Sequence, residues 1–127
     1  MEKRRVVITG MGAVTPVGIG TEEFWDALLA GKSGIAPITE FDATDFPVKI
    51  AGEVKGFDPE KYVGDKKAVR HMDRNAQFAV AAAKMAVNDA KLDMANEDPN
   101  RVGTIIGTGI GGIKTMEDTV HRIDTRG

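Results

Sequence analysis

The residues most suited to chemistry form a glycine-rich turn, Gly107-Thr-Gly-Ile-Gly-Gly112, which matches the G-x-G-x-x-G pattern of dinucleotide-binding proteins. An apolar run over 102–106 predicts a strand before it, and an amphipathic pattern from Ile113 predicts a helix after it. The ribose-binding acid expected about twenty residues further on is missing, because Asp124 belongs to the helical pattern. A tight turn that packs against another chain or a ligand is therefore favoured, and a nucleotide-binding α/β module is the alternative.

A second group of residues that could bind a ligand is basic. It comprises Lys66, Lys67, Arg70, His71 and Arg74. If helical geometry extends back from the long helix predicted after Asp73, all but Lys66 lie three or four residues apart and share one face. Two interpretations stay open. The cluster is either a solvated helix face or a docking patch for an acidic partner, where charge sets association rate and register.

The composition excludes several other kinds of site. The 127 residues contain no cysteine, so a disulfide, a thiolate metal site and a cysteine nucleophile are excluded within them. The two histidines, His71 and His121, lack partners at metal-ligand spacing, so we predict no catalytic and no metal-binding residue here. A net charge of −2 gives no basic excess for nucleic acid, and no apolar run is long enough to span a membrane. We expect a cytoplasmic protein.

The first strand and its turn set the expected fold class. Val6-Val7-Ile8 are consecutive β-branched residues, which predict a strand that is covered on both faces, as in parallel sheets. Gly10 and Gly12 follow and allow close approach of the backbone to a neighbour. Thr15-Pro16 stands where a dinucleotide-binding turn would have a glycine and start a helix, so that fingerprint fails here.

The remaining elements alternate between helices and strands. Thr21 is the expected N-cap of a first helix that Gly31 ends, and Asp58 and Gly64 bound a short one. Asp73 can cap a long helix with an alanine-rich face, whose small side chains let a neighbouring backbone approach. The other expected segments are a loop over 32–47, an exposed strand over 48–54, a strand over 102–106 and a helix from 113 almost to the last residue. This order predicts an α/β layered fold with a mainly parallel sheet.

Three segments together resemble the start of the β-ketoacyl-acyl-carrier-protein synthases, the elongating condensing enzymes of bacterial type II fatty-acid synthesis. They are Arg5–Gly18, Lys67–Arg74 and Arg101–Gly112. The helix over 24–31 also fits, and the similarity covers the whole chain in order and without large gaps.

The resemblance implies a fold and a reaction. The fold is a thiolase-like αβαβα layered sandwich, in which residues 1–127 would be the N-terminal part of the synthase domain and an incomplete first half. These enzymes are usually homodimers and use no cofactor. They transfer an acyl chain to a cysteine and condense it with malonyl-carrier protein while releasing CO2, helped by two histidines.

The resemblance also implies roles for individual residues. Ile110, between Gly109 and Gly111, corresponds to a residue that projects into the acyl channel and must yield to longer chains. Lys67, Arg70 and His71 correspond to the patch that receives acyl carrier protein. The nucleophilic cysteine and both catalytic histidines are expected beyond residue 127, so the chain alone would be inactive. The remaining alternative is a cysteine-less partner subunit of the chain-length-factor type.

Overall fold

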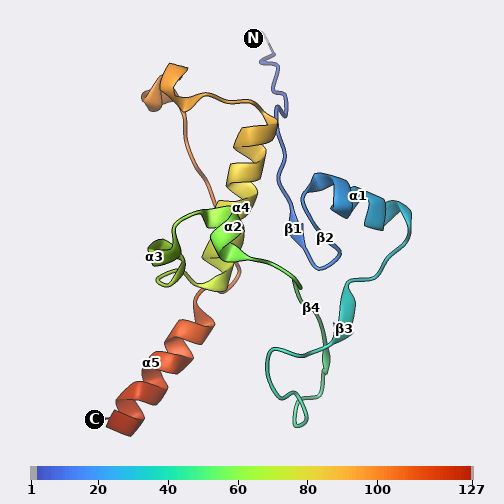
Figure 1. Cartoon of the computed structure of the whole chain (residues 1–127), viewed down its shortest axis with the longest axis vertical. Coiled ribbons are helices and arrows are strands. Elements are labelled where there is room, and N and C mark those ends of the chain that lie inside the picture. Colours follow the sequence, from blue (N-terminus) through green and yellow to red (C-terminus); the bar gives the residue numbers. More distant parts are fainter. Residues whose placement is uncertain (1–2, 127) are drawn as a thin grey trace.

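The longest helix, α4 (Arg74–Asp89), is the element around which the other segments gather (Figure 1). The computed structural model describes residues 3–126. The helix α2 (Pro59–Val63) packs against α4, and the strand β1 (Val14–Thr15) also contacts it. Ala81, near the middle of α4, is completely buried. The alanine-rich helix is therefore the central support of the fold.

Two glycines bring the N-terminal segment into direct contact with α4. A Cβ atom built on Gly12 would lie 2.7 Å from Cβ of Met85 and would collide with the carbonyl oxygen of Ala82. A Cβ atom on Gly10 would lie 2.5 Å from the backbone nitrogen of Ala90. The close backbone approach predicted for these glycines and for the alanine-rich face is confirmed.

The strands form two separate antiparallel hairpins. In the first, β1 pairs with β2 (Gly18–Ile19), and the Thr15 hydroxyl donates to the Gly18 carbonyl at 2.9 Å. In the second, β3 (Ile35–Pro37) pairs with β4 (Ile50–Gly52). The exposed strand expected over 48–54 is thus confirmed as β4. The expectation of a loop over 32–47 was wrong in part, because backbone pairing with β4 draws residues 35–37 into a strand.

The helix boundaries follow local capping chemistry. Asp58 caps α2, since its carboxylate accepts a hydrogen bond from the backbone N–H of Glu60 at 3.0 Å, and Gly64 ends this helix at a φ of 84°. Gly31, at a φ of 62°, likewise follows the end of α1 (Thr21–Leu29). The N-cap of α1 is Gly20 rather than the predicted Thr21. The other helical segments are α3 (Lys66–Val69), the 3-10 turns Met94–Asn96 and Pro99–Arg101, and α5 (Ile113–Arg126).

The parallel sheet predicted from the sequence is not formed by residues 3–126. Every strand pair described there is antiparallel, and residues 6–8 and 102–106 are extended but unpaired. Val6 is 89% exposed and Ile105 is 99% exposed, so neither segment is buried. The two segments lie on different sides of α4 (Figure 1), and each lacks the neighbouring strand that a parallel ladder requires.

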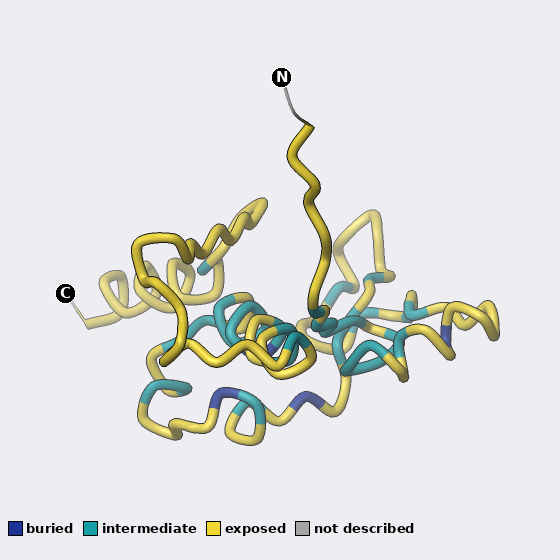
Figure 2. The backbone as a smooth tube through the Cα atoms, turned by 90° about the horizontal axis from the view of Figure 1, so that it is seen from above, coloured by how far each residue is buried: buried dark blue, intermediate teal, exposed yellow. Residues whose placement is uncertain are grey.

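Little of the chain is buried (Figure 2). Within the described range, the buried hydrophobic side chains are those of Ala27, Phe57, Val63 and Ala81. Phe57 stacks on Tyr62 with ring centroids 5.4 Å apart and meets Phe78 edge-to-face at 4.9 Å. None of the helices formed by residues 3–126 combines the length and the apolarity needed to cross a bilayer.

This burial predicts the behaviour of the isolated chain. A core of so few side chains does not offset the conformational entropy lost on folding, which is on the order of 1–2 kcal/mol per residue. We expect purified 1–127 to unfold over a broad temperature range and to bind the dye ANS. Calorimetry and dye fluorescence measure both properties. A sharp two-state transition of the monomer without dye binding would contradict this expectation.

The β3–β4 hairpin is fastened by one carboxylate. Glu53 accepts hydrogen bonds from the Thr39 hydroxyl at 2.6 Å, from the Thr39 backbone N–H at 2.8 Å and from the Glu40 N–H at 3.1 Å. These bonds, that from the Thr39 side chain above all, lower the pKa of the Glu53 carboxyl below its ordinary value of 4.5. The charged form of Glu53 is therefore the form that the folded hairpin prefers.

The lowered pKa gives the hairpin a defined pH dependence. The stabilisation by Glu53 is complete above the pKa of the unfolded chain and is lost as the pH falls through the lower pKa of the folded chain. We expect the carboxyl carbon of Glu53 to titrate below 4.5 in an NMR experiment, with Thr39 amide exchange accelerating over the same range. In Glu53→Gln this pH dependence disappears. Titration of Glu53 at or above 4.5 would refute the assignment.

Candidate functional site

The basic residues predicted to receive a partner lie on a short helix and the turn after it. The Asp65 carboxylate caps α3 by accepting hydrogen bonds from the N–H groups of Lys67 at 2.8 Å and Ala68 at 3.2 Å. Lys67 belongs to α3, Arg70 ends it, and His71 follows directly. All three of these side chains are exposed. We call Lys67, Arg70 and His71 the basic patch.

The single helical face expected for the cluster is not formed, because the helix is interrupted. Residues 70–73 form a turn between α3 and α4, so Arg74 begins a new helix. The Arg74 guanidinium donates to the Val54 carbonyl at 3.1 Å and lies over the Phe78 ring, 5.0 Å from its centroid. Lys66 is paired with Glu60 at 3.2 Å. The basic patch is therefore smaller than the sequence cluster.

A residue that the sequence reading did not single out holds this turn in place. The side-chain amide of Gln77 donates to the carbonyl of Met72 at 3.0 Å and to that of Val69 at 3.2 Å. Both bonds are partly buried. The Val69 carbonyl also accepts a hydrogen bond from the backbone N–H of Met72 at 3.2 Å, so Gln77 reinforces a turn that the backbone already forms. In the sequence, Gln77 could have been noticed as a single side-chain amide on the apolar face of an alanine-rich helix.

The glycine-rich turn lies against the N-terminal end of the same helix. A Cβ atom on Gly111 would lie 2.5 Å from Nδ2 of Asn75, and one on Gly112 would lie 3.0 Å from Oδ2 of Asp73. Gly112 has a φ of 74°, a conformation that L side chains rarely adopt. The backbone conformation therefore favours glycine at 112, whereas a side chain at 111 would have to displace the exposed amide of Asn75.

Asp73 precedes α4 but its side chain does not cap that helix, contrary to the prediction. Its Oδ1 atom instead accepts a hydrogen bond from the hydroxyl of Thr115, in the first turn of α5. The two residues are 42 positions apart, so no local pattern in the sequence indicates the contact. Asp73 therefore links the start of α4 to the start of α5.

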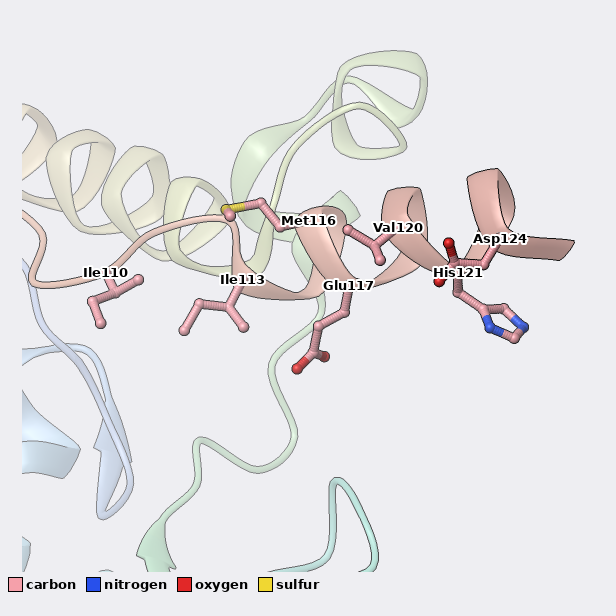
Figure 3. Close-up of a pocket in the computed structure, with 7 residues that line it drawn as sticks. All are labelled: Ile110, Ile113, Met116, Glu117, Val120, His121 and Asp124. Atoms are coloured by element: carbon pink, nitrogen blue, oxygen red, sulfur yellow. The ribbon is translucent and has the colours of Figure 1, made fainter. Parts of the chain in front are cut away.

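Ile110 opens a groove along α5 (Figure 3). The groove has a volume of about 480 Å³ and is mainly apolar, with Ile113, Met116 and Val120 along it. Ile110 and Ile113 point to the same side of the backbone, and the Ile110 side chain is 76% exposed. Glu117, His121 and Asp124 are the polar residues of the lining. An apolar molecule or segment is the kind of occupant that such a lining favours.

The geometry disfavours phosphate chemistry at this turn. A phosphate bound at the N-terminus of α5 would meet the Asp73 carboxylate beside Gly112. The residues before the turn also lack strand structure, which the dinucleotide-binding motif requires. In the part of the chain that the structure describes, no group of three or more metal-ligating side chains gathers either.

An α/β chain with a glycine-rich turn, an apolar groove and a basic patch near one helix end fits the condensing-enzyme class that the motifs indicate. The family model described as "Beta-ketoacyl synthase, N-terminal domain" matches residues 3–126 of this chain. The chain therefore belongs to the β-ketoacyl synthase family.

Curated relatives extend this similarity across the chain. It is 48% identical to a 3-oxoacyl-[acyl-carrier-protein] synthase 2 of Synechocystis sp. over 93% of this chain and 28% of that protein. It is 49% identical to the synthase of the same name from Coxiella burnetii over 100% of this chain and 30% of that protein. The chain thus spans less than a third of the length of these relatives.

Solved structures show the same family. The ishigamide ketosynthase/chain length factor superposes with a TM-score of 0.68 at 43% identity, over 75% of this chain and 23% of that one. A type II polyketide ketosynthase, in complex with its acyl carrier protein and bound to the hexaketide, gives a TM-score of 0.71 at 36% identity. That similarity covers 96% of this chain and 28% of the other.

Proposed function

We propose that the chain is the N-terminal part of an elongating 3-oxoacyl-acyl-carrier-protein synthase. Such an enzyme condenses an acyl thioester with malonyl-acyl carrier protein, with loss of CO2, during fatty-acid elongation. The observation that carries this proposal is the 49% identity to a synthase of that name over the full length of the chain. In this role residues 1–127 supply scaffold, a wall of the acyl channel and contacts to the carrier protein.

Ile110 is the proposed acyl-channel residue, flanked by Gly109 and Gly111. Its side chain is exposed at the mouth of an apolar groove, so it can meet an alkyl chain without first leaving a packed core. Among the residues that the structure describes, a Cβ atom on Gly109 would meet no atom within 4 Å, which leaves room for the turn to move on that side. Both features suit a residue that yields to longer acyl chains.

Lys67, Arg70 and His71 form the proposed docking site for acyl carrier protein. The three side chains are exposed, and the Asp65 cap and the Gln77 amide hold their backbone. The solved ketosynthase in complex with its acyl carrier protein supports a partner of this kind.

The remaining parts of the proposal concern the whole enzyme. The rest of its polypeptide would complete the thiolase-like layered sandwich and cover the apolar segments 6–8 and 102–106. It would also supply the nucleophilic cysteine and the two histidines, because the chain has no cysteine and its own histidines lie on the surface. We further propose a homodimeric, cytoplasmic enzyme that needs no cofactor.

A second candidate is a non-catalytic partner subunit of the chain-length-factor type. It is favoured by the 43% identity to a solved ketosynthase/chain length factor. The two candidates differ at one position of the polypeptide, the nucleophile beyond residue 127. A cysteine there supports the enzyme, and another residue supports the partner subunit.

A chimaera tests the docking proposal. Residues 1–127 replace the aligned segment of the Synechocystis synthase, and Lys67→Glu and Arg70→Glu are introduced together. We expect the KM for acyl-carrier protein to rise about tenfold, equivalent to about 1.4 kcal/mol of binding free energy, with kcat nearly unchanged. Steady-state kinetics at low and high salt measure both constants, and the variant should lose most of the salt dependence.

The control is Lys32→Glu, an exposed lysine outside the basic patch. It changes the net charge in the same direction and should leave the KM within about twofold of the parent chimaera, because Lys32 is not part of the proposed docking site. An equal rise in KM for Lys32→Glu, or no rise for the double variant, would refute the assigned patch. A parent chimaera without condensing activity would refute the proposed function itself.

A further inference from the structure

The glycine-rich turn has one half that is packed and one that is open. On the packed side, Gly111 and Gly112 rest on Asn75 and Asp73, where an added Cβ atom would come within 2.5 Å and 3.0 Å of their side chains. On the open side, added Cβ atoms on Gly107 and Gly109 would meet no atom of residues 3–126 within 4 Å. Ile110 stands at the boundary between the two halves.

The packed half contacts the start of α4 through the carboxylate of Asp73, the residue before the helix, and through the amide of Asn75 in its first turn. One oxygen accepts the hydrogen bond from the Thr115 hydroxyl in α5, and the other lies against Gly112. The Asp73 side chain makes no capping hydrogen bond to α4. Its contacts are therefore with the glycine-rich turn and with α5. Hydrogen bonds to a charged acceptor are about twice as strong as neutral ones.

We infer that Asp73 is a positioning residue that fixes the end of a one-sided hinge carrying Ile110. The segment 107–109 moves when a longer acyl chain presses on Ile110, while Gly111, Gly112 and the start of α5 stay attached to α4. The acyl-chain-length limit then depends on Asp73, which touches no substrate. We call the hydrogen bond between the Asp73 carboxylate and the Thr115 hydroxyl the anchor. The link to acyl-chain length rests on the proposed function, whereas the existence of the anchor does not.

The anchor also lies close to the basic patch. Asp73 follows His71 by two residues, in the turn that Gln77 holds through the Met72 carbonyl. The fixed end of the hinge and the proposed carrier-protein contact therefore share one short segment at the N-terminus of α4. An acyl chain delivered at this segment would reach Ile110 on the open side of the turn.

The test uses the chimaera with Asp73→Ala, Asp73→Asn, Thr115→Val and Thr115→Ser. Removal of the acceptor or of the donor should free the turn, so Asp73→Ala and Thr115→Val should raise the kcat/KM for a long acyl chain relative to a short one by about tenfold. Serine keeps the hydroxyl donor and should retain the parent ratio. Asparagine keeps an oxygen acceptor but loses the charge, so its ratio should lie between those of the parent and Asp73→Ala. Thr115→Val tests the same bond if Asp73→Ala does not fold.

The structural control is Asp58→Ala, which removes the capping carboxylate of α2. It should lower the melting temperature, since loss of a helix cap destabilises the fold, without changing the kcat/KM ratio between long and short acyl chains. A change in that ratio for Asp58→Ala as large as that for Asp73→Ala would overturn the inference, because general destabilisation would then explain both.

Hydrogen exchange separates the anchor from the proposed function. Amides of residues 107–116 should exchange faster in Asp73→Ala, while those in the middle of α4 stay protected. Unchanged exchange over 107–116 would overturn the anchor, whatever the kinetics. Faster exchange with an unchanged chain-length ratio would overturn the hinge. If Ile110→Ala then also leaves the ratio unchanged, the failure lies in the role proposed for Ile110 rather than in the anchor.

Discussion

The close approach of the N-terminal backbone to α4 is the contact on which the arrangement of the chain depends. Gly10 and Gly12 have no side chain, and the facing residues of the helix include alanines, so the backbone comes within a distance that a single added methyl group would prevent. The Met11 N–H then donates to the Asp89 carboxylate at 2.8 Å. This contact places the β1–β2 hairpin beside α4, and α1 packs against β2.

The same helix organises both parts of the proposed site. Its first turn supplies Asn75 and Gln77, and Asp73 directly precedes it. Gln77 holds the turn that carries the basic patch, whereas Asp73 and Asn75 support the glycine-rich turn that carries Ile110. The proposed carrier-protein contact and the proposed acyl-channel residue, about forty positions apart in sequence, thus both rest on the N-terminal end of α4. In a condensing enzyme, this arrangement would fix where the acyl chain enters relative to Ile110.

The sequence predicted features that depend on neighbouring residues better than features that depend on residues far apart in the chain. Asp58, Gly64 and Gly31 were predicted correctly because capping and a positive φ involve only neighbouring residues. The prediction of strands over 6–8 and 102–106 was wrong for residues 3–126, because a strand needs a partner and these two segments do not pair with each other. At the candidate site, the resemblance to the β-ketoacyl synthases identified Ile110 and the basic patch as candidate residues. They could not indicate the Asp73–Thr115 bond, which tertiary packing alone creates.

The backbone contact with α4 is what we expect to hold this part of the synthase together. Gly12→Ala in the chimaera removes the space that this contact needs, and Lys32→Ala, at an exposed position outside the contact, is the comparison. Gly12→Ala should lower stability by about 1–3 kcal/mol, the usual cost of overpacking, as a clear fall in melting temperature. Lys32→Ala should stay within about 0.5 kcal/mol of the parent. Equal melting temperatures for the two variants would show that the glycine contact does not hold the segment together.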